Sequence, residues 1–173
     1  LYGFVRLNGL RIPKSMKFWW LAFWMGLFGN ALPFTLIGWG EQTIDSGLAA
    51  ILMAVMPLTT LLLVHFFSAD EKLTPMKLIG MLVGFFGIII LVGPEALKGL
   101  GSDVLPQIAV ATAAFSYAVA TTIAKNVPRQ HPAVNSTGLT FMASIQMILM
   151  SMAFEAPLSL TPSTTSVTAA VYL

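Results

Sequence analysis

The sequence predicts an all-α protein, a polytopic bundle of transmembrane helices. Two properties of its 173 residues carry this prediction: hydrophobic residues make up 57% of the chain, and charged residues make up only 9%. Soluble domains average roughly 45–50% hydrophobic and about 25% charged residues, so this chain has too few charges to cover a water-facing surface. The third observation is the arrangement of the hydrophobic residues, which form long continuous runs between short polar segments.

Five of these runs are long enough to cross a bilayer completely. A hydrocarbon core of about 30 Å needs roughly 17–25 helical residues. A backbone in lipid must pair its polar groups internally, so each run is predicted to be a helix. A β-barrel would need alternating segments of about 10 residues, whereas these runs are continuous. The predicted spans are residues 18–40, 47–68, 76–93, 104–124 and 133–154.

Shorter hydrophobic stretches at the two ends predict two partial spans. Residues 1–5 resemble the last residues of a membrane-spanning helix whose start is absent. Residues 167–173 resemble the first residues of another such helix, which the sequence does not complete. We therefore expect the chain to be a fragment of a longer membrane protein.

The positions of Lys and Arg predict the orientation in the membrane. The loops at 6–17, 69–77 and 125–132 carry eight of the nine basic residues, and the alternate loops carry one. Short loops rich in Lys and Arg stay on the cytoplasmic side, so these three loops are predicted to be cytoplasmic. No Lys/Arg-rich tract with interleaved aromatic residues is present, so nothing supports nucleic-acid binding.

The sequence offers no pattern typical of an enzyme. It contains no HExxH, no GxSxG and no P-loop motif. It has no cysteine, and its two histidines are not spaced as metal ligands. No Asp, Glu, Lys or Arg lies deep inside a predicted span. We expect neither catalysis nor a cofactor or metal site.

Several uncharged polar residues lie deep within the predicted spans, and four of them stand out. They are candidates for lining a substrate cavity, and the alternative for each is a hydrogen bond within or between helices, since a polar group in a dry bundle needs a partner. The four residues are Asn30, Ser116, Tyr117 and Gln146.

Two prolines and a group of glycines predict bends and close packing. Pro33 and Pro57 lie inside spans, where each removes one helical hydrogen bond, so both are candidates for bending a helix that lines a cavity. Gly80, Gly84 and Gly87 repeat along one span. The GxxxG spacing places two glycines on one helix face and lets another backbone approach. This predicts helix packing, with a homodimer interface as the alternative.

Several runs of residues carry a family resemblance. Residues 45–58 read DSGLAAILMAVMPL and are followed by DEKLT at 70–74 and by a glycine-spaced helix at 78–91. This pattern resembles the EamA-type members of the drug/metabolite transporter superfamily, which have a helix of small residues ending in a mid-membrane proline, a short loop and a glycine-spaced helix. Met53 stands where many members have Asn, and Lys72 where Arg is usual.

The resemblance implies a carrier of ten helices, built from two five-helix repeats of opposite orientation. Residues 1–94 then hold the end of helix 2 and helices 3–5 of the first repeat. Residues 95–173 hold helices 6 and 7 and the start of helix 8 of the second repeat. The implied function is secondary transport by alternating access in the cytoplasmic (inner) membrane of a bacterium. The implied cargo is a small metabolite, an amino acid or a drug-like compound, moved outward.

A second class of function stays open at this point. The alternative is a membrane scaffold or sensor that does not transport and that assembles through the glycine face of the third span.

Overall fold

The computed structural model describes residues 1–67, 73–125, 127, 130–154, 163–165 and 168, and these residues fold mainly into helices. The helices before the first long loop are α1 (Tyr2–Leu7), α2 (Met16–Gly26), a π-helical turn (Leu27–Ala31, here the π-turn) and α3 (Leu32–Gly40). Those that follow are α4 (Ser46–Met53), α5 (Met56–Phe67), α6 (Pro75–Val92), a 3₁₀ helix (Pro94–Gly99), α7 (Val104–Ala124) and α8 (Pro132–Phe154).

The structure confirms the five predicted complete spans. Five helical stretches are long and apolar enough to cross a membrane, and their limits lie within two residues of the predicted ones. Two of the five are interrupted. The first consists of α2, the π-turn and α3, and the second consists of α4 and α5. The predicted partial span at 167–173 lies outside the described residues except for residue 168.

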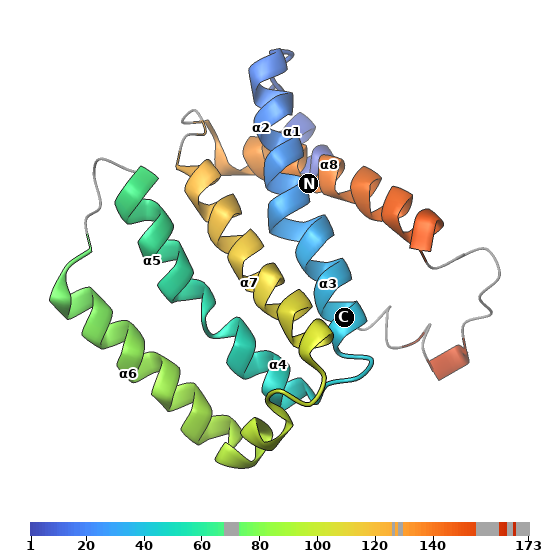
Figure 1. The fold of residues 1–173 in the computed structure, drawn as a ribbon. Helices are drawn as coiled ribbons and strands as arrows, with labels where there is room; N and C mark the ends of the chain where they lie inside the picture. The colour runs from blue at the N-terminus through green and yellow to red at the C-terminus, as the bar shows by residue number, and fades with distance from the viewer. Residues whose placement is uncertain (68–72, 126, 128–129, 155–162, 166–167, 169–173) are drawn as a thin grey trace.

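Helix α7 forms the centre of the bundle. It packs against α3, α4 and α5 and also contacts α2 and the π-turn, and Figure 1 shows it between α5 and the α2–α3 span. Small side chains let these neighbours approach closely. Five alanines of α7 are buried: Ala109, Ala113, Ala114, Ala118 and Ala120.

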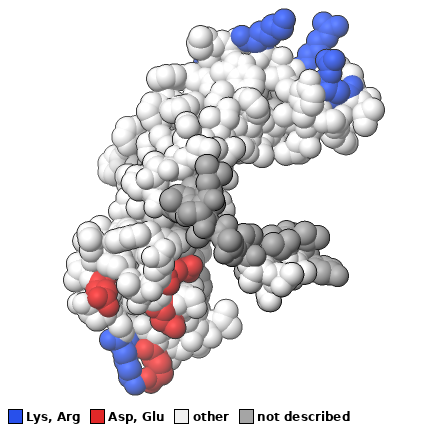
Figure 2. Space-filling view, turned by 90° about the vertical axis from the view of Figure 1, so that its right-hand side faces the viewer, with Lys and Arg blue, Asp and Glu red and all other residues white. Residues whose placement is uncertain are grey.

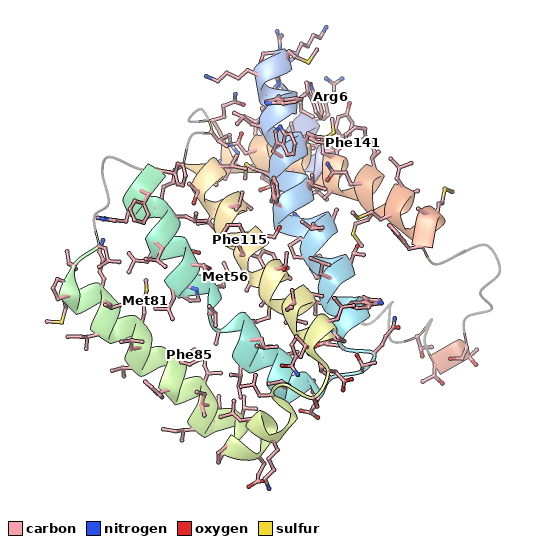
Figure 3. All side chains as sticks on the ribbon, in the orientation of Figure 1. Arg6, Met56, Met81, Phe85, Phe115 and Phe141 are labelled. Atoms are coloured by element: carbon pink, nitrogen blue, oxygen red, sulfur yellow. The ribbon has the colours of Figure 1, made fainter. Side chains whose placement is uncertain are left out.

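Helix α8 crosses α2 and the π-turn (Figure 1). Close to the start of α8, Val134 is buried in a small cluster with Val5 of α1 and Phe18 of α2. Farther along α8, the ring of Phe141 makes an edge contact with Trp19, with ring centroids 5.9 Å apart (Figure 3). The first span is therefore held on one side by α7 and on the other by α8.

Helix α6 lies at the edge of the bundle and has no buried residue. It contacts α4 and α5, and Met81 and Phe85 are half-buried on the side of α6 that faces α5 (Figure 3). Most of the rest of its surface is exposed and strongly apolar, which suits a helix that faces lipid or another transmembrane helix.

The charged residues separate to opposite ends of the molecule. Figure 2 shows Lys and Arg at one end of the visible face, and Asp and Glu at the other end with one basic side chain among them. Lys98 forms an ion pair with Glu95 in the 3₁₀ helix, where both side chains are exposed. This segregation matches the charge pattern of the sequence. The cytoplasmic location of the basic end is still a prediction from the charge pattern.

Candidate functional site

The first membrane span is interrupted at its middle by the π-turn. At this point the N–H of Leu32 donates to the carbonyl of Leu27, five residues earlier, where an α-helix would bond four residues earlier. A single π-helical turn inside an α-helix is rare and occurs often at functional sites. Pro33 follows directly and is fully buried. The sequence predicts a bend at Pro33, and the structure shows that the irregular turn comes before it.

The carbonyl of Phe28 has no backbone donor in this arrangement. Its α-helical donor would be the N–H of Leu32, which already donates to Leu27. Its π-helical donor would be residue 33, which is a proline without an N–H. The hydroxyl of Ser116 on α7 donates to this carbonyl at 2.9 Å, and Ser116 is 1% exposed. Ser116 therefore satisfies a buried acceptor that Pro33 and the π-turn together leave free.

Gln146 of α8 makes a second bond to the same span. Its Nε2 donates to the carbonyl of Phe23 at 3.0 Å, and the side chain is 8% exposed. The Oε1 atom of this amide is buried and has no hydrogen-bond partner. The Gln146 side chain therefore uses its Nε2 donor and leaves its buried Oε1 acceptor without a partner. A buried acceptor without a partner costs free energy.

Asn30 and Tyr117 are the two candidate cavity residues that lack side-chain hydrogen bonds to the described part of the chain. Both are half-buried, and neither side chain makes a hydrogen bond with any residue that the structure describes. Asn30 lies within the π-turn itself, and Tyr117 is the neighbour of Ser116 on α7. Ser116 and Gln146, by contrast, have hydrogen bonds between helices. A role of any of the four in substrate contact stays a prediction.

Pro57 lies at a second interruption, between α4 and α5. Helix α4 ends at Met53, two turn residues follow, and α5 begins at Met56. Pro57 has no N–H to donate to the carbonyl of Met53, four residues earlier, so the α-helix cannot continue regularly through this point. Pro57 itself is exposed, so it does not contact the polar groups near the π-turn within the described structure.

The glycines predicted to pack closely are not those that make close contacts in the described bundle. A Cβ added at Gly80, Gly84 or Gly87 would meet no described atom within 4 Å. At Gly26 it would lie 2.9 Å from Gln146 Oε1 and 3.0 Å from the backbone N of Ala143. The packing role of the α6 glycines stays a prediction.

Gly26 has close counterparts along the first span and on α8. At Gly29 the added Cβ would lie 3.2 Å from Ala120 Cβ, at Gly40 2.7 Å from Val110 Cγ2, and at Gly138 2.6 Å from Phe18 Cζ. In this way the first span touches α7 at two heights and α8 at two more. The sequence signal for these contacts is the recurrence of glycine at 26, 29 and 40.

The larger cavities on the described part of the bundle lie at its two ends. One, of about 550 Å³, lies at the acidic end, and Asp45, Glu95 and Asp103 are among its lining residues. The other, of about 710 Å³, is mainly apolar and lies between α1, α2 and α8, where Lys14 and Trp19 are part of its wall. Neither cavity includes Asn30, Ser116, Tyr117 or Gln146 in its lining.

Comparison with known proteins gives one family. The model of the EamA-like transporter family matches residues 3–93. The chain is 27% identical over 122 residues to the uncharacterized transporter YoaV of Bacillus subtilis (strain 168). The aligned region covers 70% of this chain and 41% of YoaV. It is 26% identical over 95 residues to an uncharacterized transporter of Archaeoglobus fulgidus, covering 55% of this chain and 34% of that protein. The chain thus spans less than half the length of these relatives. No solved structure matches it.

Proposed function

This chain belongs to the EamA-like transporter family, and we propose on that premise that the full-length protein is a secondary transporter. It exports a small metabolite, an amino acid or a drug-like compound across the cytoplasmic membrane of a bacterium. Three findings support this proposal: the family match, the two relatives that are named as transporters, and five apolar helices long enough to cross a bilayer.

The observation that carries the proposal is the interrupted first span, which has at its middle a polar side chain without a partner among the described residues. Carriers place their substrate sites near the bilayer midplane, beside helices that are broken there. Asn30 lies in the π-turn, and its amide has no partner among the described residues. An amide at this depth costs free energy when it is unpaired, and a substrate that binds next to it removes that cost.

Alternating access requires two bodies that move against each other. In our proposal these are the two repeats, of which residues 1–94 and 95–173 are parts. Helices α2 to α5 belong to the first part, and α7 and α8 to the second. The first part contacts the second mainly through α3 and α5 on α7 and through α2 on α8. Rocking along these contacts exposes the midplane site to one side of the membrane and then to the other.

The walls that these helices supply are uncharged at depth. Asn30 and Tyr117 offer an amide and a phenol, which donate and accept hydrogen bonds without a fixed charge. Such a wall suits an uncharged or zwitterionic small molecule better than a multiply charged one, because burying an unpaired charge is costly.

Transport by the full-length protein in liposomes tests the proposal. Asn30→Ala removes the unpaired amide, and Pro57→Ala removes the interruption of the second span. We expect both variants to lose at least tenfold in flux of a substrate that the parent protein moves. The matched control is Asn8→Ala, because the Asn8 side chain donates only to the carbonyl of Phe4 in its own short helix. Parental flux in both variants would refute these site assignments.

A second candidate function is a membrane scaffold or sensor that does not transport. One observation favours it: Gly80, Gly84 and Gly87 meet open space on α6, as expected for a face that packs on another molecule. It predicts that Gly84→Leu abolishes an oligomer of the full-length protein, measured by light scattering in detergent. It also predicts that the parent protein moves no solute.

A further inference from the structure

The two hydrogen bonds at the π-turn connect the two parts of the chain. Phe23 and Phe28 belong to the first span, whereas Ser116 and Gln146 come from α7 and α8, 88 and 123 residues away from them. Phe28 lies in the π-turn, whereas Phe23 lies in α2 one turn earlier, where its carbonyl also accepts the N–H of Leu27; both donors are buried. One bond thus ends on the π-turn and the other on the helical turn before it, where the two parts meet.

The composition of the turn suits a shift in its hydrogen bonds. A π-turn contains one more residue than an α-turn, so a shift of one residue in its hydrogen bonds moves the irregularity along the helix. Gly26 and Gly29 flank or lie within the turn, and glycine restricts backbone dihedrals less than other residues do. A shift of this size rotates the residues on one side of the turn by about 100° relative to the other side.

The described arrangement leaves part of its polar groups unsatisfied. Gln146 Oε1 is buried without a partner, and the Asn30 side chain has no partner among the described residues. Buried unpaired acceptors are uncommon in native structures and call for an explanation. An arrangement in which the turn moves and these groups find other partners supplies one.

We propose that Ser116 and Gln146 are positioning residues that hold the π-turn in one of two registers. Their two bonds to the carbonyls of Phe28 and Phe23 stabilise the register described here. Release of both bonds lets the turn take the second register when the transporter changes the side to which it opens. Because Asn30 lies in the π-turn, the shift also rotates its side chain toward or away from the substrate. This inference rests on the proposed function for its link to transport, but the two registers are testable without it.

Hydrogen exchange of the full-length protein in nanodiscs tests the registers directly. Ser116→Ala removes one donor, and Gln146→Met removes the other with little change in side-chain volume. We expect the exchange rate of amides 27–35 to rise about three- to twentyfold in each variant, the range that interhelical hydrogen bonds in lipid contribute to an equilibrium. Amides 56–67 of α5 should not change, which separates a local effect from general destabilisation.

Thr112→Val is the matched control on the same helix. The Thr112 hydroxyl lies one turn before Ser116 and donates to the carbonyl of Ile108 in α7 itself. Its loss should leave exchange at residues 27–35 unchanged. Equal rises in Thr112→Val and Ser116→Ala would overturn the proposal, as would an unchanged rate in Ser116→Ala.

Pro33→Ala provides a rescue experiment. It restores an N–H at residue 33, which donates to the carbonyl of Phe28 in the π-helical pattern. The effect of Ser116→Ala on exchange should therefore be at least halved in the Pro33→Ala background. An effect of the same size in both backgrounds would show that Ser116 does not act through this carbonyl, and the proposal would fail.

Transport kinetics distinguish a register switch from a structural bond. In liposomes, we expect Ser116→Ala and Gln146→Met to lower kcat at least threefold and to change KM less than twofold, because the register controls the conformational step. Equal losses in both parameters would contradict a positioning role. If the parent protein moves no solute while the exchange pattern and the rescue hold, the proposed function fails and the two registers stand.

Discussion

Replacement of Gly26 by alanine tests the packing of the first span most simply. The added Cβ would lie 2.9 Å from Gln146 Oε1, 3.0 Å from the backbone N of Ala143 and 3.4 Å from Ala143 Cα. Carbon atoms in good contact are about 3.5–4.0 Å apart, so α2 and α8 must separate locally by about half an ångström. The Gln146 side chain has little freedom to move away, because its Nε2 is bound to the carbonyl of Phe23.

The expected cost follows from two opposing contributions. Overpacking in a well-packed region costs about 1–3 kcal/mol, and the backbone contact with Ala143 places this site in the upper half of that range. Alanine in place of glycine in a helix returns up to about 1 kcal/mol. The net prediction is a loss of about 1–2 kcal/mol in the free energy of unfolding, because the steric contribution is the larger one.

Equilibrium unfolding of the full-length protein in detergent measures this loss. Gly38→Ala is the matched control, since Gly38 lies in the same span and a Cβ there meets no described atom within 4 Å. This control should be neutral or more stable than the parent. Equal unfolding midpoints for Gly26→Ala and Gly38→Ala would refute the close approach of α2 to α8.

Three further predictions use the same measurement. Gln107→Leu should lower stability by about 1–3 kcal/mol, because the buried Gln107 amide donates to Gly99 O at 2.8 Å and accepts from Gly101 N–H at 3.0 Å; no loss would mean that water replaces both bonds. Gly138→Ala should destabilise by about 1–3 kcal/mol, because its Cβ would lie 2.6 Å from Phe18 Cζ, and adding Phe18→Leu should remove most of that loss. His65→Ala should cost about 1 kcal/mol or less, because its Nδ1 accepts one bond, from the N–H of Leu73 at 3.1 Å; a larger loss would contradict this limited role.

The membrane spans were predictable because their cause lies in the local sequence. Long apolar runs determine which residues cross the bilayer, and polar caps mark where helices begin. Ser15 accepts a hydrogen bond from the N–H of Phe18, Asp45 from that of Gly47, and Thr74 from that of Lys77. Each cap stands within three residues of a predicted span limit, so hydropathy and capping agree on these boundaries.

The interruption of the first span was predictable only in part. Pro33 indicates that a hydrogen bond is missing, but it does not tell which turn becomes irregular. The side-chain donors that reach this region, Ser116 and Gln146, come from distant helices. The sequence shows these residues as polar groups at depth. It does not show that two are bound to backbone carbonyls while Asn30 and Tyr117 are not.

The glycine spacing was a poor guide to packing within the described bundle. A GxxxG pattern tells that two glycines share a helix face, but the neighbour on that face depends on tertiary structure. The regular spacing in α6 meets open space, whereas Gly26 and Gly40, which follow no such pattern, touch α8 and α7.

Accessibility of residue 30 from the two sides of the membrane tests alternating access at the π-turn most directly, and it needs no knowledge of the cargo. Asn30→Cys is introduced into the full-length protein without other reactive cysteines, and a membrane-impermeant maleimide is added to right-side-out or to inverted vesicles. An alternating-access transporter exposes this position to each side in turn, so we predict labelling in both preparations. Labelling from one side alone, or from neither, would contradict a midplane site that opens to both sides.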